Sequence, residues 1–146
     1  LHDALPISLL VFVVAMFLAF STGTSWGTFG ILIPICMALF LTDPTMMVIS
    51  MSACMAGAVF GDHCSPISDT TIMASTGADC DLLTHVNTQF PYAAVVAAVS
   101  AVCFLVAGFT QTPWIALIVG IVLIIAVLFC LKMIVKKKYG LPTLNN

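Results

Sequence analysis

Two aspartates in a strongly apolar chain are the residues best suited to chemistry. Asp62 and Asp69 lie within the polar stretch Gly61–Thr71, and no Lys or Arg precedes residue 132. A carboxylate at membrane depth is costly unless it is paired, hydrated or neutralised. These two must therefore hold a proton, bind a cation or pair with a group outside this sequence, and burial favours exchange of a proton for Na⁺. The structural alternative is that Asp69 caps a helix beginning near Thr70 and Asp62 lies in an aqueous loop.

Hydroxyl groups accompany both aspartates, and a second polar stretch carries more of them. Hard cations prefer oxygen ligands. The candidate cation- and proton-binding residues are Asp62, Asp69, Ser65, Ser68, Thr70 and Thr71. The candidates in the second stretch are Thr22, Gly23, Thr24, Ser25 and Thr28. The alternative is that these hydroxyls only satisfy backbone groups freed by helix breaks.

His63 follows Asp62 directly and is a candidate proton relay, because imidazole titrates near neutral pH. Its alternative role is that of a hydrogen-bonded structural histidine. Asp62, His63 and Cys64 are adjacent in sequence, and adjacent side chains rarely converge on one ion, so we expect no metal beyond transported Na⁺. His85 is expected on the solvated face of a loop.

The composition identifies the class of protein that must position these residues. Of 146 residues, 62% are hydrophobic and 7% are charged, against roughly 25% charged residues in soluble domains. This excludes an ordinary soluble protein and a disordered chain, and the lack of basic residues excludes a nucleic-acid binder. The six cysteines have no CxxC spacing, and we interpret them as small hydrophobic residues. We predict an all-α, polytopic membrane protein.

Four apolar segments divide into long and short ones. Phe90–Phe109 and Pro113–Leu131 approach the ~20 residues that a spanning helix needs and predict two continuous transmembrane helices. Ser8–Ser21 and Phe29–Leu41 are too short to cross alone. They form either a re-entrant helical hairpin with a polar tip or one long helix broken in the middle, and we favour the hairpin.

A further segment, Met46–Phe60, is also short for a span. Small residues recur at every fourth position, at Ala53, Gly57 and Gly61. This spacing puts them on one face, where another backbone can approach closely. Met46–Thr76 is long enough to cross only as a discontinuous transmembrane helix, and Pro66 favours a break at Ser65. Two polar breaks at membrane depth are typical of a transporter binding site.

The two ends of the chain support further expectations. Lys132 and Lys136–Lys138 follow the last helix, so we expect a cytoplasmic C-terminus with a tail over 139–146 and a cytoplasmic loop over Gly77–Gln89. Residues 1–7 resemble the translation of a sequencing adapter and are interpreted as an artefact. The transmembrane domain is then expected over residues 8–138.

The polar stretches resemble those of a known family. Thr22–Thr28, Gly61–Thr71 and His85–Tyr92 resemble, in this order, segments of the NhaC-type Na⁺/H⁺ antiporter family. The resemblance implies a secondary transporter built from inverted repeats, each with a re-entrant hairpin and a discontinuous helix. The chain then looks like a C-terminal fragment, one half of an inverted-repeat transporter. Without the N-terminal half we expect it to be inactive.

The function implied is Na⁺/H⁺ antiport across the plasma or inner membrane by alternating access. The alternative is a Na⁺- and H⁺-coupled organic-acid antiporter of the malate/lactate type on the same scaffold. We expect no enzyme, because an intramembrane hydrolase needs a nucleophile with a base or a metal triad. No cofactor is expected beside transported Na⁺ and H⁺. The expected partners are membrane lipid and the N-terminal half, with a homodimer as one option.

Overall fold

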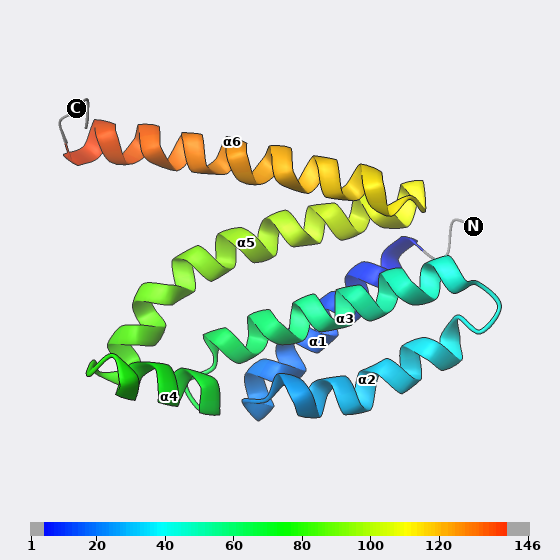
Figure 1. Ribbon diagram of the computed structural model, residues 1–146, viewed down its shortest axis with the longest axis horizontal. Helices are drawn as coiled ribbons and strands as arrows, with labels where there is room; N and C mark the ends of the chain where they lie inside the picture. The colour runs from blue at the N-terminus through cyan, green and yellow to red at the C-terminus, as the bar shows by residue number, and fades with distance from the viewer. Residues whose placement is uncertain (1–4, 140–146) are drawn as a thin grey trace.

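Six helices joined by short connections make up the part of the chain that the computed structural model describes, residues 5–139 (Figure 1). The helices are α1 (Leu5–Thr22), α2 (Ser25–Leu39), α3 (Pro44–Cys64), α4 (Asp69–Gly77), α5 (Leu82–Thr110) and α6 (Pro113–Tyr139). The all-α prediction is confirmed for these residues. Three helices are long and apolar enough to cross a membrane: α3, α5 and the stretch Trp114–Met133 of α6.

The chain reverses direction between α1 and α2, so the two helices run side by side in opposite directions (Figure 1). Gly23 takes the left-handed conformation that the turn requires, with φ +67°, and its N–H donates to the Ala19 carbonyl. Thr24 then caps α2 by accepting a hydrogen bond from the N–H of Gly27 at 3.3 Å. This cap makes Ser25–Thr28 the first turn of α2, so the polar tip is shorter than the predicted stretch.

The small-residue face of α3 packs against the backbone of α1. A Cβ atom at Gly57 would overlap the carbonyl oxygen of Phe12, and one at Gly61 would overlap that of Met16. Ala53 is fully buried on the same face. The predicted close approach of another backbone is confirmed, and the partner is α1.

Helix α3 is longer than predicted, because Gly61–Cys64 are helical rather than part of the break. The expectation that this segment is too short to cross alone was wrong. Proline constrains itself and the residue before it, so Pro66 ends the helix only at Ser65, whose backbone is extended. The break therefore covers residues 65–68, and α4 begins at Asp69, inside the polar stretch Gly61–Thr71.

The predicted loop Gly77–Gln89 was also wrong over most of its length. Asp81 caps α5 by accepting hydrogen bonds from the backbone N–H and hydroxyl of Thr84, at 3.0 and 3.2 Å. The helix consequently starts at Leu82, and Pro91 lies inside it rather than in its first turn. Helix α6 likewise continues past the predicted end at Leu131, into the residues assigned to a tail.

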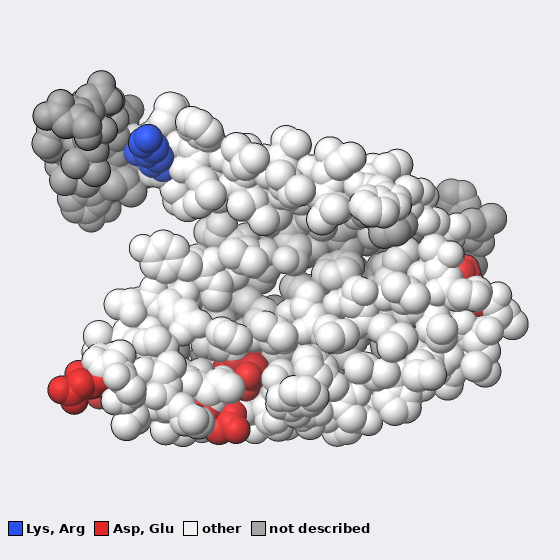
Figure 2. Space-filling model, in the orientation of Figure 1, with Lys and Arg blue, Asp and Glu red and all other residues white. Residues whose placement is uncertain are grey.

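Charge is sparse on the molecular surface (Figure 2). Acidic residues gather near α4, and the described lysine, Lys132, lies exposed toward the C-terminal end of α6. The other three lysine side chains, most of the predicted tail (140–146) and residues 1–4 of the predicted adapter segment lie outside the described residues. Leu5–Ile7 of that segment form the start of α1.

The α1–α3 contact generates a stability test. Gly57→Ala should lower the thermal unfolding midpoint of the detergent-purified protein, because overpacking costs about 1–3 kcal/mol. Gly30→Ala is the matched control, since a Cβ there has no neighbour within 4 Å and alanine favours the helix. Equal midpoints for Gly57→Ala and the unmodified protein would contradict the described contact.

Candidate functional site

The carboxylate of Asp62 is buried in the last turn of α3, with only 3% of the residue exposed. Its Oδ1 accepts a hydrogen bond from the Ser68 hydroxyl at 2.7 Å. Its Oδ2 accepts from the hydroxyls of Thr70 at 3.2 Å and Ser25 at 3.4 Å. Three hydroxyl groups from three separate segments therefore converge on one carboxylate.

The polar tip and the helix break fit together at this site. Ser65 donates from its hydroxyl to the Phe20 carbonyl of α1 at 2.8 Å. A Cβ at Gly23 would lie 2.8 Å from the Ile67 carbonyl oxygen, so only glycine allows this approach. These two contacts hold the start of α2, and with it Ser25, beside the break.

Among the residues that the structure describes, no Lys or Arg side chain pairs with the carboxylate; the first Lys of the sequence is Lys132, and there is no Arg. Hydroxyls are its hydrogen-bonding partners. The hydroxyl oxygens of Ser68 and Thr70 also lie 2.8 Å apart with either as donor, and because each hydroxyl has one proton, they bond each other only when one of them does not donate to the carboxylate. The Thr71 hydroxyl donates to the Asp62 carbonyl at 3.4 Å. Each hydroxyl can both donate and accept, so this group of oxygens can adapt to a proton or a cation.

The other predicted residues of the polar tip bond to nearby backbone instead. The Thr22 hydroxyl donates to the Leu18 carbonyl, and the Thr28 hydroxyl donates to the Thr24 carbonyl. Thr24 itself serves as the α2 cap. Of the five residues predicted there, Ser25 is the one whose side chain reaches the Asp62 carboxylate.

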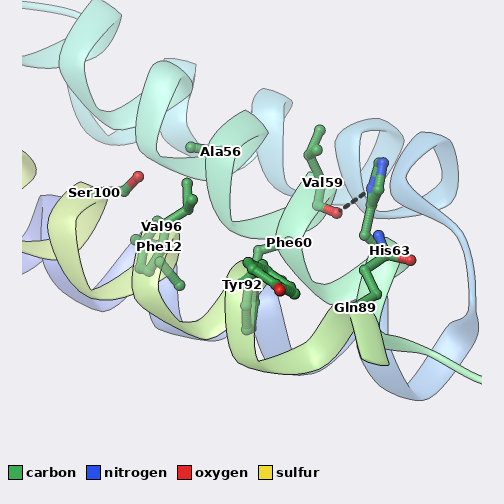
Figure 3. Close-up of a pocket in the computed structure, with 11 residues that line it drawn as sticks. Phe12, Ala56, Val59, Phe60, His63, Gln89, Tyr92, Val96 and Ser100 are labelled. Carbon is green, nitrogen blue, oxygen red and sulfur yellow. Dashed lines mark hydrogen bonds between the residues drawn. The ribbon is translucent and has the colours of Figure 1, made fainter. Parts of the chain in front are cut away.

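Asp69 and His63 are exposed, and their hydrogen bonds go to backbone groups rather than to the buried carboxylate. Asp69 is exposed in the first turn of α4, where its Oδ1 accepts from the N–H of Thr70 at 2.8 Å. His63 is exposed, and its Nδ1 lies 2.9 Å from the Val59 carbonyl one turn earlier (Figure 3). Shared ion binding by Asp69 and proton transfer by His63 stay predictions.

A pocket of about 280 Å³ lies next to this site, and the sequence did not predict it. Its lining residues are His63, Thr70, Thr71, Ala74, His85 and Gln89. His85 and Gln89 were assigned to a solvated loop. Asp81 and Thr84 have the spacing of a helix N-cap, and His85 and Gln89 follow as an i, i+4 pair. This pattern could have placed His85 and Gln89 on one helix face.

Fold and site together define a helical membrane protein with a buried, hydroxyl-lined carboxylate that has no Lys or Arg partner within residues 5–133. The model of the Na⁺/H⁺ antiporter family matches residues 2–109. The chain belongs to this family. No solved structure matches it.

Three relatives show how far the similarity extends. An uncharacterized protein of Haemophilus influenzae is 50% identical over 129 residues, which cover 88% of this chain and 24% of the relative. The malate-2H⁺/Na⁺-lactate antiporter of Bacillus subtilis is 34% identical over 99 residues, 66% of this chain and 21% of that protein. An uncharacterized Na⁺/H⁺ antiporter of Haemophilus influenzae is 39% identical over 80 residues, 52% of this chain and 17% of that protein. The chain thus spans about a quarter or less of these relatives.

The hydrogen bond between Ser68 and Asp62 can be tested without transport. Ser68→Ala should destabilise the protein by about 1.5–3 kcal/mol, the range for hydrogen bonds to charged groups. Ser52→Ala is the control, because Ser52 is exposed on α3 and bonds only its own helix. Thermal unfolding in detergent at neutral pH measures both, and an effect of Ser68→Ala no larger than that of Ser52→Ala would contradict the described site.

Proposed function

We propose that this chain forms the cation site of a Na⁺/H⁺ antiporter and that Asp62 is the group that exchanges the two ions. The observation that carries the proposal is a buried carboxylate whose hydrogen-bonding partners in the described part of the chain are hydroxyls, with no Lys or Arg among them. A buried charge of this kind needs a counter-charge or a proton. Na⁺ and H⁺ each supply one.

Oxygen atoms suited to a sodium ion surround Asp62. The carboxylate oxygens and the hydroxyls of Ser25, Ser68 and Thr70 come from α2, the break and α4. Rotation of each hydroxyl proton away from the centre would turn a lone pair toward the ion. The C-terminal end of α3 adds partial negative charge at the same place.

A proton would bind to the same carboxylate, and the hydroxyls would then accept a hydrogen bond from it instead of donating one. When Asp62 carries a proton, it donates to one of the surrounding hydroxyls, and no net charge stays buried. A proton lowers the affinity for Na⁺, and Na⁺ lowers the affinity for a proton, because both neutralise one carboxylate. This competition is the basis of the proposed exchange.

The arrangement of the helices supports the proposed transport mechanism. We propose that α1 and α2 form a re-entrant hairpin, and that α3 and α4 form a discontinuous transmembrane helix broken beside Asp62. Broken helices of this kind build ion sites in inverted-repeat transporters. The chain spans about a quarter of its relatives' length, so alternating access, an N-terminal half and a possible partner copy in a homodimer belong to the proposal. The same holds for a plasma-membrane location with the C-terminus in the cytoplasm.

Organic-acid exchange is the second candidate, favoured by the similarity to the malate-2H⁺/Na⁺-lactate antiporter. It shares the cation site and differs in requiring an organic acid. Proteoliposomes loaded with lactate and diluted into malate distinguish the two candidates. Proton-driven Na⁺ flux that is equally fast without either acid supports the first candidate, and flux that requires an acid supports the second.

Transport by Asp62 can be tested in a full-length protein, made by placing this chain in the matched segment of the 50% identical Haemophilus influenzae relative. Asp62→Asn should abolish Na⁺-dependent proton movement and equilibrium Na⁺ binding, because the amide cannot neutralise a cation. Asp69→Asn should retain binding, since Asp69 is exposed and outside the hydroxyl cluster. A pH-sensitive dye in proteoliposomes and radioactive Na⁺ binding measure the two properties. Normal exchange by Asp62→Asn would refute the assignment.

A further inference from the structure

We propose that the pocket between α3, α4 and α5 is the aqueous vestibule through which the cation reaches Asp62. The inference rests on the proposed function and adds the route and the residues that form it. The pocket has a volume of about 280 Å³, enough for several water molecules. A cation can therefore enter it with part of its hydration shell.

The vestibule and the cation site share a wall. Thr70 and Thr71 line the pocket. Their hydroxyls donate to Asp62, from Thr70 to Oδ2 at 3.2 Å and from Thr71 to the carbonyl at 3.4 Å. One layer of side chains thus separates the pocket from the buried carboxylate. A rotation of these two hydroxyls would give an entering ion its first protein ligands.

A neighbouring pocket shows by contrast why the vestibule suits an ion. That pocket, about 320 Å³ between α3 and α5, shares His63 and Gln89 with the vestibule, but its walls carry residues such as Phe12, Phe60 and Val96 (Figure 3). Moving a hydrated cation along such apolar walls is unfavourable. The vestibule is lined instead by two imidazoles, an amide and two hydroxyls, with Ala74 as the one apolar residue.

The charges around the vestibule favour cations. Asp69 on α4 and Asp79 and Asp81 in the α4–α5 connection are exposed. Figure 2 shows acidic residues on the surface near α4 and the lysine elsewhere, toward the end of α6. A region of one sign of charge beside a low-dielectric wall raises the local concentration of the opposite ion. A small organic anion would meet the same field as a repulsion.

A charge placed in the vestibule should therefore alter Na⁺ entry according to its sign. In the full-length chimera, His85→Lys should slow initial Na⁺ uptake at low Na⁺ and low ionic strength by about threefold or more, and His85→Glu should accelerate it. Both effects should shrink in high salt. Asn87→Lys is the control, because Asn87 is exposed on the same helix but does not line the pocket. Unchanged or faster Na⁺ uptake by His85→Lys would overturn the proposal.

Blocking the vestibule separates this proposal from the assignment of Asp62. Ala74→Trp should slow exchange of external for internal Na⁺ at least about tenfold, because the indole fills the pocket, while equilibrium Na⁺ binding in detergent is retained. Met73→Trp is the control, since Met73 is 72% exposed on α4 and outside the lining. Loss of binding in Asp62→Asn tests the site itself. Normal exchange by Ala74→Trp, with Asp62→Asn inactive, would overturn the vestibule alone.

Discussion

The rest of the site depends on one electrostatic constraint: the Asp62 carboxylate is buried, and no Lys or Arg side chain in the described part of the chain pairs with it. Three hydroxyls stabilise it, but hydrogen bonds from neutral groups do not remove its charge. A salt bridge would have satisfied the carboxylate permanently and closed it to exchange. No salt bridge forms in this cluster among the described residues, and under the proposed function a mobile ion, Na⁺ or H⁺, balances the charge.

The hydroxyls reach Asp62 only because two segments far apart in the sequence, the α1–α2 turn and the break between α3 and α4, are packed closely together. Gly57 and Gly61 let α3 lie against the α1 backbone, and Gly23 lets the α1–α2 turn approach Ile67 in the break. Ser65 then bonds the end of α1. A larger side chain at any of the three glycines would push the turn away and withdraw Ser25 from the carboxylate. Under the proposed function, the close packing of these helices therefore also sets the positions of the oxygen atoms that would bind the ion.

Much of the architecture could be predicted from the sequence, and the errors have a common cause. The apolar runs predicted the helical class, and the glycine spacing predicted the close helix contact. The polar stretches were assigned to loops because polarity was treated as a sign of irregular backbone. Capping by Thr24 and Asp81 instead extends helices through polar residues, and Pro66 ends α3 later than its polar composition suggested. The same error affected the prediction of the site. Asp62 and the hydroxyl-rich residues around it were predicted as candidates, whereas His85 and Gln89 were missed because the start of α5 was assigned to a loop.

The sequence by itself indicated a helical membrane protein that resembles an antiporter family, with an aspartate far in sequence from the first Lys. Composition and local motifs suffice for these conclusions, since both are properties of the residues and their order. Only the tertiary structure decided which hydroxyls reach Asp62. Ser25, Ser68 and Thr70 do so, whereas Thr22, Thr24 and Thr28 bond their own backbone. That distinction depends on where α2 starts and how it meets the helix break, which is a matter of packing between segments about forty residues apart.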